Sequence, residues 1–227
     1  MILNIETSTS VCSVSIQLED QLLGSIALHL EKSHSSVLPV IIGQLLDQVG
    51  VAKAELLAVG ISEGPGSYTG LRIGASTAKG LAFALGIPLI AVNALDSMIN
   101  QVPTGLLTNE DVLMPMMDAR RMEVYMKAVS SSKKKVMPLQ ALVLEANSFD
   151  HILNRRLVLF GNGAEKAVDC LIYPNKVLVK NVMPSAVGMV TDVYDKYVAG
   201  NFEDVAYFEP LYLKEFQTKK SKDLLRP

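Results

Sequence analysis

Two short polar segments contain the residue types that could bind a phosphate group. The first, residues 63–74, reads Glu-Gly-Pro-Gly-Ser-Tyr-Thr-Gly-Leu-Arg-Ile-Gly and lies between an apolar strand and a helix of small residues. A glycine-rich turn before a helix leaves backbone N–H groups free to bind an anion. A P-loop needs Gly-Lys-Ser/Thr, however, and Gly70 is followed by Leu71 and Arg72. The dinucleotide fingerprint Gly-x-Gly-x-x-Gly also fails, because Thr69 stands in place of its third glycine.

The second segment is a hydroxyl-rich turn, residues 6–10, which follows an apolar strand. In sugar-kinase and actin-like folds this position holds an acid, a glycine and a hydroxyl group that bind phosphate. Here Glu6 is the acid, but Thr7 takes the glycine position, and its side chain would crowd a phosphate. We interpret Glu6, Thr7 and Ser8 as a vestigial phosphate turn. The alternative is a polar hairpin turn stabilised by hydroxyl-to-backbone hydrogen bonds.

The remaining candidate groups favour neither a metal site nor a nucleophilic hydrolase. The three histidines are His29, His34 and His151. The first two are five residues apart, which would place them on different faces of a helix. Ser67 does not lie in the Gly-x-Ser-x-Gly pattern of a nucleophile elbow. Cys12 and Cys170 lie far apart in apolar contexts, as expected of buried free thiols. We therefore predict no catalytic residue, no metal and no cofactor.

Composition indicates a globular chain without a general attraction to nucleic acid. The 227 residues are 49% hydrophobic and 19% charged, with a formal net charge of −2. Local basic runs occur at 133–135 and 219–222; such runs are usually solvated, and RNA contact through them stays open. There is no run of 18 apolar residues, and residues 1–6 lack the basic start of a signal peptide. We expect a cytoplasmic protein that does not enter the membrane.

Periodicity predicts a mixed α/β sheet in the first half of the chain. Strands are expected at 1–5, 11–18, 22–30, 56–62 and 89–92, with helices at 34–48, 70–85 and 93–100. Ser33 or Ser35 is the expected N-cap of the first helix, and Thr69 that of the second. The order β-β-β-α-β-α-β predicts a sheet that is antiparallel at first and parallel later.

The second half repeats this element order, which predicts two related lobes. Strands are expected at 112–117, 122–129 and 158–160, an exposed connection at 130–135, and helices at 164–171 and 185–199. The inward residues of the last helix would be Val187, Val190, Val193, Tyr194 and Tyr197. We predict an N-terminal lobe at 1–105 and a smaller C-terminal lobe at 106–227, whose last segment packs back on the first lobe.

Two predicted helices, 34–48 and 70–85, carry residues suited to a partner. Small residues on the second helix would allow close approach of another helix, and the first helix has apolar residues beyond one stripe. The predicted partner interface comprises Val37, Val40, Ile41, Gly70, Ile73, Gly74, Thr77, Ala78 and Leu81. The alternative is that both helix faces are buried inside the lobe.

Six segments together resemble the TsaB family, also called YeaZ, of tRNA threonylcarbamoyladenosine biosynthesis. They are Ile5-Glu6-Thr7-Ser8-Thr9, His34-Ser35 with Leu38-Pro39, the run 64–74, Ala78-Lys79-Gly80-Leu81-Ala82, Gly86-Ile87-Pro88, and the run 118–125. Residues 161–163 and 210–214 fit later motifs of the family. Glu6 and Tyr68 depart mildly from it, because many relatives carry aspartate and phenylalanine there. The resemblance implies an actin-like, sugar-kinase-like (ASKHA) fold of two related lobes, with mixed sheets flanked by helices.

The resemblance also implies a non-catalytic scaffold subunit. Its relative TsaD transfers the threonylcarbamoyl group and holds a metal through a histidine pair, whose positions are Ala94 and Met98 here. The two helices would pair with TsaD, or with a second copy when the chain is alone, and TsaE would join the complex. The complex would modify the adenosine 3′ to the anticodon in tRNAs reading codons that start with A, with this chain touching tRNA weakly or indirectly. Alternatives are a metal-dependent peptidase-like or ATP-hydrolysing enzyme of the same fold, and a stand-alone RNA-binding module.

Overall fold

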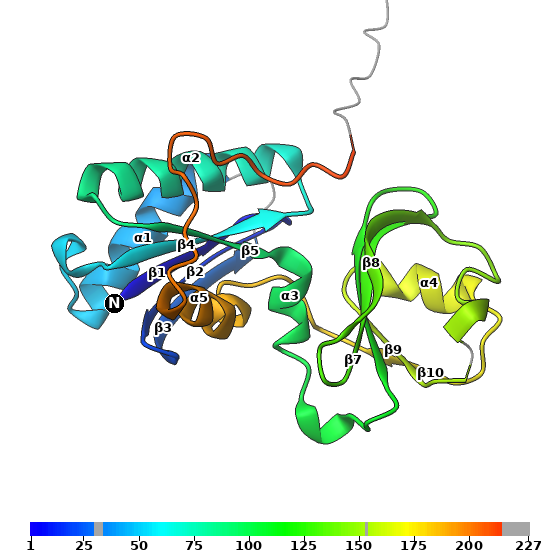
Figure 1. Ribbon diagram of the computed structural model, residues 1–227. Coiled ribbons are helices and arrows are strands. Elements are labelled where there is room, and N and C mark those ends of the chain that lie inside the picture. The colour runs from blue at the N-terminus through cyan, green and yellow to red at the C-terminus, as the bar shows by residue number, and fades with distance from the viewer. Residues whose placement is uncertain (30–33, 153, 215–227) are drawn as a thin grey trace, which may run out of the picture.

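The computed structural model describes residues 1–29, 34–152 and 154–214. It has two α/β lobes side by side, each built on a five-stranded mixed sheet (Figure 1). The first sheet contains β1 (Ile2–Glu6), β2 (Val11–Leu18), β3 (Gln21–His29), β4 (Ala58–Gly64) and β5 (Leu89–Asn93). The second contains β6 (Val112–Asp118), β7 (Glu123–Ser130), β8 (Lys135–Val143), β9 (Leu157–Phe160) and β10 (Lys176–Val179).

The two sheets have the same topology. Their strand orders are β3-β2-β1-β4-β5 and β8-β7-β6-β9-β10. In each, the first three strands pair antiparallel, the fourth strand pairs parallel with the first, and the fifth pairs parallel with the fourth. The predicted actin-like fold with a repeated element order is confirmed.

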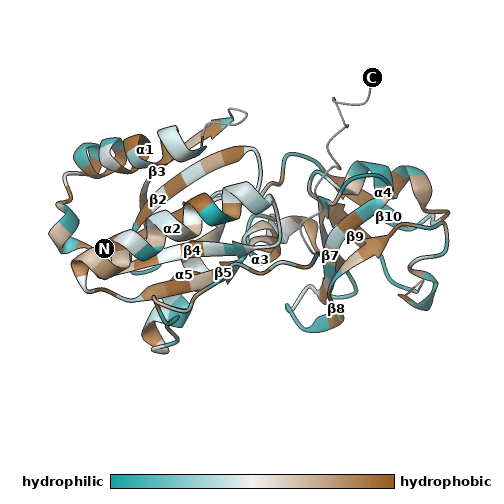
Figure 2. Cartoon of the chain, turned by 90° about the horizontal axis from the view of Figure 1, so that it is seen from above, coloured by the Kyte–Doolittle hydropathy of each residue, from teal (hydrophilic) through white to brown (hydrophobic). Residues whose placement is uncertain are grey.

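Two long helices cover one face of the first sheet. Helices α1 (His34–Val49) and α2 (Tyr68–Leu85) lie on the near face when the molecule is seen from above (Figure 2). Their inward apolar residues pack on Leu3, Ile5 and Ile61 of the sheet. The opposite face is covered by α5 (Val190–Val198), whose Val193 packs against Ile90 and Val92. The first sheet is therefore enclosed on both sides.

The second lobe has shorter helices. Helix α4 (Ala164–Cys170) covers one face of its sheet through Ala164 and Ala167. Helix α3 (Ala94–Ile99) lies between the lobes and packs on the other face, against Leu113 and Phe160. Short 3-10 turns occur at Lys53–Glu55, Thr104–Leu106, Asp150–Ile152 and Val187–Met189. None of the described helices has the length and apolarity needed to cross a lipid bilayer.

The chain returns from the second lobe to the first near residue 186. After α5, residues 201–214 form a segment that we call the strap. Glu203 of the strap pairs with Leu89 at the edge of the first sheet. Lys79 of α2 donates hydrogen bonds to the carbonyl oxygens of Ala206 and Phe208, both at 3.0 Å. The strap therefore crosses α2. The lobe boundary at residue 105 stays a prediction.

Several local predictions were wrong. Ser67, not Thr69, is the N-cap of α2, and its Oγ accepts from Gly70 N at 3.3 Å. Strands β8 and β10 had no predicted counterpart, and Lys135 begins β8 within the expected connection. The last helix starts at Val190 after a 3-10 turn, which leaves Val187 40% exposed. The Ser33 cap, position 30 of the predicted third strand and the lysines at 219, 220 and 222 lie outside the described residues.

Candidate functional site

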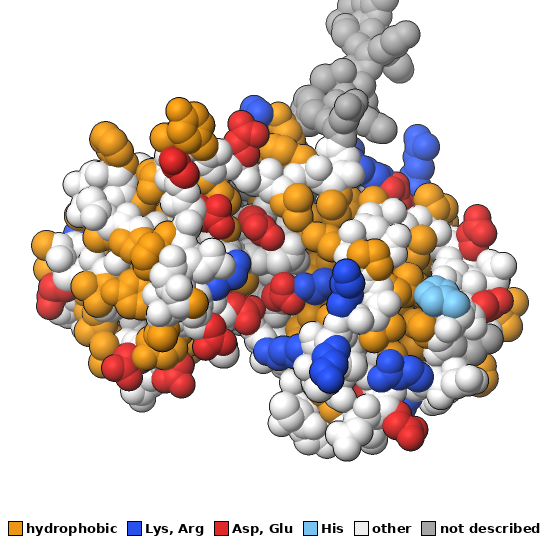
Figure 3. All heavy atoms as spheres, viewed as in Figure 1, with side chains coloured by type: hydrophobic (Ala, Val, Ile, Leu, Met, Phe, Trp, Pro, Cys, Tyr) orange, Lys and Arg blue, Asp and Glu red, His pale blue; other side chains and the backbone are white. Residues whose placement is uncertain are grey.

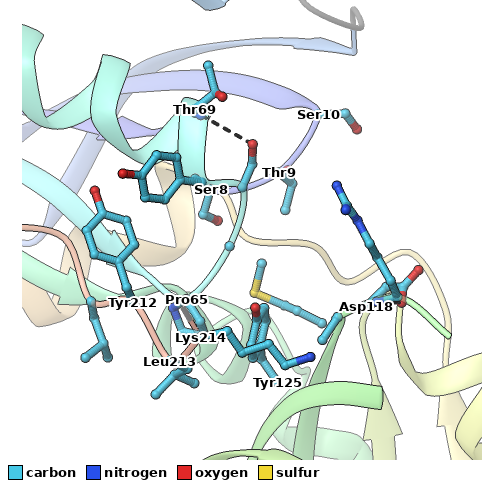
Figure 4. Close-up of a pocket in the computed structure, with 18 of the residues that line it drawn as sticks. Ser8, Thr9, Ser10, Pro65, Thr69, Asp118, Tyr125, Tyr212, Leu213 and Lys214 are labelled. Atoms are coloured by element: carbon cyan, nitrogen blue, oxygen red, sulfur yellow. Dashed lines mark hydrogen bonds between the residues drawn. The ribbon is translucent and has the colours of Figure 1, made fainter. Parts of the chain in front are cut away.

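A cleft of about 750 Å³ lies between the two lobes. Its first-lobe wall includes Ser8, Thr9 and Ser10, His34, and residues 65–70, which lead into the start of α2. Asp118, Arg120 and Tyr125 line it from the second lobe, and strap residues Leu211–Lys214 line a third side (Figure 4). The topology thus brings both candidate phosphate turns to one place.

The two turns are packed directly on each other. Ser67 N donates to Ser8 O at 2.6 Å, and Thr7 Oγ1 donates to Gly70 O at 2.9 Å. A Cβ added to Gly66 would lie 2.2 Å from Ser8 O, and one added to Gly70 would lie 2.2 Å from Thr7 O. These glycines are therefore needed because the 6–10 turn occupies the space in front of them. Carbonyl oxygens of the 6–10 turn lie directly against the glycines of the second turn.

Glu6 lies behind this contact and is fully buried. Its Oε1 accepts a hydrogen bond from Ser8 N at 2.5 Å. Burial raises the pKa of the Glu6 carboxyl group, and hydrogen bonding from Ser62 and Ser8 opposes the rise without cancelling it. A buried carboxyl group that turns inward to brace the turn is a structural group and would repel an anion when ionised.

On the second-lobe wall, the negative charge of Asp118 is balanced by a lysine of the same lobe. Partial burial favours a higher pKa for Asp118, but hydrogen bonds from Lys166 and from Arg120 N outweigh it, and the pKa falls below its ordinary value. Asp118 Oδ1 lies 2.6 Å from Lys166 Nζ and 2.7 Å from Arg120 N. Burial raises the pKa of Tyr125, which supports its neutral hydroxyl form. The geometry offers polar contacts but no activated nucleophile among these residues.

The strap joins α2 to the second lobe, whereas the sequence analysis predicted only that this last segment packs back on the first lobe. The Tyr212 and Tyr68 rings lie 4.9 Å apart, and the Arg72 guanidinium lies 4.4 Å over Tyr68. Arg72 Nε donates to the Tyr212 hydroxyl group at 3.3 Å. At the other end, Lys214 forms an ion pair with Glu123. The family motif at 210–214 was a signal for an ordered segment, but it did not indicate these contacts.

The predicted partner interface needs a correction. Ile41, Gly70, Gly74 and Ala78 are buried inside the lobe, so they face the sheet and the 6–10 turn instead of a partner. A Cβ on Gly74, for example, would lie 2.2 Å from Thr7 Oγ1. The remaining predicted residues reach the outer surface of the helices, fully or in part: Val37, Val40, Ile73, Thr77 and Leu81. The small residues of α2 thus serve packing within the lobe.

The positions of the predicted missing metal ligands are occupied by core side chains. Ala94 and Met98 lie on α3, both fully buried in the apolar cluster between the lobes. His34 Nε2 lies 2.9 Å from the carbonyl oxygen of Thr9, within the wall of the cleft. No group of three or more His, Cys, Asp or Glu side chains that could hold a metal occurs in the described part of the chain.

Comparison with known proteins links the chain to tRNA modification. The family model of TsaD, tRNA N6-adenosine threonylcarbamoyltransferase, matches residues 16–225. The TsaB protein of Bacillus subtilis (strain 168), named for tRNA threonylcarbamoyladenosine biosynthesis, is 35% identical over 126 residues. That match covers 55% of this chain and 52% of the relative, so the chain spans about half the length of this curated relative.

Two further relatives match over nearly the whole chain. TsaB of Escherichia coli (strain K12) is 26% identical over 225 residues, which is 94% of each protein. A crystal structure from Pseudomonas aeruginosa, described as an uncharacterized protein similar to peptidase YEAZ, superposes with a TM-score of 0.82 at 25% identity. The superposition covers 94% of this chain and 99% of that one.

Proposed function

Because the chain belongs to the TsaD family, in its TsaB (YeaZ) branch, we propose that it is a non-catalytic scaffold and activator subunit. In this proposal it pairs with a TsaD-type transferase and supports threonylcarbamoyl transfer to the adenosine 3′ to the anticodon. The tRNAs concerned read codons that start with A, and the complex works in the cytoplasm with TsaE as a third subunit. Residues 1–105 supply the pairing helices.

The outward surface of α1 and α2 is the observation that carries the proposal. Val40 of α1 is 54% exposed, and Ile73, Thr77 and Leu81 of α2 are partly exposed. Gly80 lies inside α2, and a Cβ added to it would meet no atom within 4 Å. Glycine inside a helix costs about 1 kcal/mol relative to alanine. A partner helix that approaches closely would give this exposed glycine a use.

The same surface would serve two partners. In the transferase complex, α1 and α2 would pack against the corresponding helices of the TsaD-type subunit. In the isolated chain the surface would pair with a second copy, as an isologous contact in which both copies use the same surface and every contact occurs twice.

Two features of the interior support a non-catalytic role. Ala94 and Met98 fill the core where the transferase is expected to carry its histidine pair, and the 6–10 turn fills the glycine turn. The purified chain should therefore hydrolyse neither ATP nor peptides. Turnover of either substrate that is abolished by Glu6→Gln or Thr7→Ala would overturn the proposal.

Reconstitution with a TsaD-type transferase tests the pairing surface. Val40→Glu places a charge in the proposed contact and should abolish co-elution of the two proteins in size-exclusion chromatography. Leu18→Glu is the matched control, because Leu18 is 46% exposed but lies at the end of β2. This control should co-elute like the unmodified chain.

The outcomes distinguish a wrong pairing surface from a wrong function. If Val40→Glu pairs normally, the assignment of the surface to α1 and α2 is wrong. If the unmodified chain neither pairs with the transferase nor raises its threonylcarbamoyl transfer to tRNA, the scaffold function itself is wrong.

A further inference from the structure

Charge is divided unevenly between the two lobes. Residues 106–186, which contain the whole second sheet, include 11 lysines and arginines and 8 acidic residues. The rest of the chain contains 10 basic and 15 acidic residues. In Figure 3, basic side chains gather over the second lobe and acidic ones dominate the first. The small net charge of the whole chain is therefore the sum of a basic second lobe and an acidic remainder.

The second sheet brings basic residues from three separate segments to one of its ends. Val129, next to the end of β7, is paired with Lys135 at the start of β8. On the other side, Leu157 at the start of β9 pairs with Lys176 at the start of β10. We call Lys133, Lys134, Lys135, Arg155 and Lys176 the basic edge. It extends over the five strands, which is about 19 Å at roughly 4.8 Å per strand spacing.

The ion pairs found in the described part of the chain do not involve the basic edge. Arg156 is paired with the buried Asp111, and Lys127 with Asp96. In contrast, Lys133 Nζ donates to the neutral amide oxygen of Asn100 at 2.6 Å, and Arg155 Nε to the carbonyl oxygen of Glu110 at 3.1 Å.

The other three residues of the edge also lack an acidic partner within the described residues. Lys176 Nζ donates to a carbonyl oxygen, that of Leu171. Lys134 and Lys135 are exposed, and within the described residues their side chains have no hydrogen bond or ion pair. Two acidic residues lie near the edge: Glu110 is exposed next to the bond from Arg155, and Asp192 accepts from Nδ2 of Asn100 at 2.9 Å, the same amide that Lys133 contacts. The edge therefore presents a net positive surface to a polyanion.

A polar hollow adjoins the lysines. It has a volume of about 240 Å³ and is lined by Thr104, Leu107, Thr108, Asn109, Ser131 and Ser132. Hydroxyl and amide groups beside cations are typical contacts of a nucleic-acid backbone, because phosphate oxygens and ribose hydroxyl groups can accept from them. Cations and hydroxyl groups thus meet at one end of the lobe.

We propose that the basic edge binds the sugar-phosphate backbone of tRNA directly. This inference rests on the proposed function, which supplies the tRNA, and it changes the expectation of weak or indirect contact. The edge lies at the end of the second lobe where β6, β9 and β10 begin, whereas the pairing surface lies on α1 and α2 of the first lobe. One chain can then hold the transferase with one lobe and the tRNA with the other.

The test compares two variants with the same change in net charge. Lys134→Gln/Lys135→Gln removes charge from the basic edge, and Lys53→Glu removes the same charge from an exposed site on the first lobe. Binding of an unmodified tRNA transcript is measured for the complex with the transferase between about 50 and 200 mM salt. We expect the double variant to lose about tenfold in affinity, and its salt slope to fall by about 1.5 for two lost phosphate contacts.

The control variant tests for a general charge effect, and the pairing assay tests for loss of the transferase. Lys53→Glu should keep its affinity within about twofold, because a general charge effect would lower both variants equally and would overturn the inference. An unchanged salt slope for the double variant also overturns it. If the double variant loses the transferase but not the tRNA, the edge contacts an acidic protein and the inference is wrong. Failure of the unmodified chain to pair with the transferase refutes the proposed function instead.

Discussion

The two lobes have the same strand order, but their interiors differ. Each has a glycine turn after its fourth strand, with φ +101° at Gly64 and φ +103° at Gly161. Each turn donates to the first-strand segment of its own lobe, from Ser67 N to Ser8 O and from Gly163 N to Met116 O. The first lobe, however, carries helices of 16 and 18 residues, whereas α4 in the second lobe has 7.

Buried polar residues are also distributed unequally between the two lobes. Of the described buried polar residues, only Ser97 and Asp111 lie outside positions 4–62. In the first lobe, Ser15 and Gln17 bond to the backbone of the returning chain at Ala186 and Val190. The interior of the second lobe is formed by Val, Leu, Met and Ala, apart from a few aromatic residues. The smaller lobe relies on hydrophobic burial and on the buried Asp111–Arg156 ion pair, while the first lobe also uses specific hydrogen bonds to fix the chain that crosses back to it.

The glycine turns provide the largest expected effect. Gly66→Ala would place a Cβ 2.2 Å from Ser8 O and 2.9 Å from Ser8 C, so the backbone must move. We expect a loss of about 3 kcal/mol or more in the free energy of unfolding, measured by urea denaturation. Gly163→Ala in the second lobe meets its first atoms at 2.9 Å and should cost less. Gly80→Ala is the control and should stabilise by about 0.5–1 kcal/mol. Equal losses at Gly66 and Gly163 would contradict the difference between the turns.

The buried carboxyl groups of the two lobes should respond to pH in opposite ways. Asp111 is paired with Arg156, and hydrogen bonds from Arg156 lower its pKa from 3.8 to about 2. Its contribution is present above pH 3.8 and is lost as pH falls towards 2. Asp111→Asn should therefore cost about 2–3 kcal/mol at neutral pH and little near pH 2, as followed by urea denaturation at each pH.

Glu6 in the first lobe should show the opposite pH dependence, because its pKa is raised. Its pKa is raised by burial, so its contribution is present below its ordinary value of 4.5 and is lost as pH rises through the folded-state value. Glu6→Gln should remove this loss and make the variant more stable than the unmodified chain at high pH. A Glu6→Gln variant that is destabilised equally at every pH would show that burial does not govern this group.

The sequence predicted the repeated architecture more accurately than the detailed contacts. Apolar runs and glycine turns sufficed for eight of the strands, because fully buried strands such as β1 and β4 read as continuous apolar stretches. Strands β8 and β10 were not predicted, because exposed residues interrupt the apolar pattern in both. Which face of α2 is buried could not be read from its small residues, since Gly74 and Ala78 suit a partner helix and the 6–10 turn equally well. The strap depends on contacts between Tyr68 and Tyr212, which are far apart in the sequence.

The polar contacts of the returning chain provide the smallest expected effect. Gln17 is fully buried; its Nε2 donates to Val190 O at 3.0 Å, and its Oε1 accepts from Asn4 Nδ2 at 2.6 Å. Gln17→Met keeps the volume but removes these bonds, which should cost about 1–2 kcal/mol. Because Val190 begins α5, hydrogen exchange in α5 should accelerate more than in α4. The matched control is Gln140→Met in the second lobe, where the hydrogen-bond partner of Gln140 Nε2 among the described residues is Met126 Sδ at 3.9 Å. That variant should stay within about 0.5 kcal/mol of the unmodified chain. Equal costs for the two substitutions, or unchanged exchange in α5, would show that apolar packing alone holds the returning chain on the first lobe.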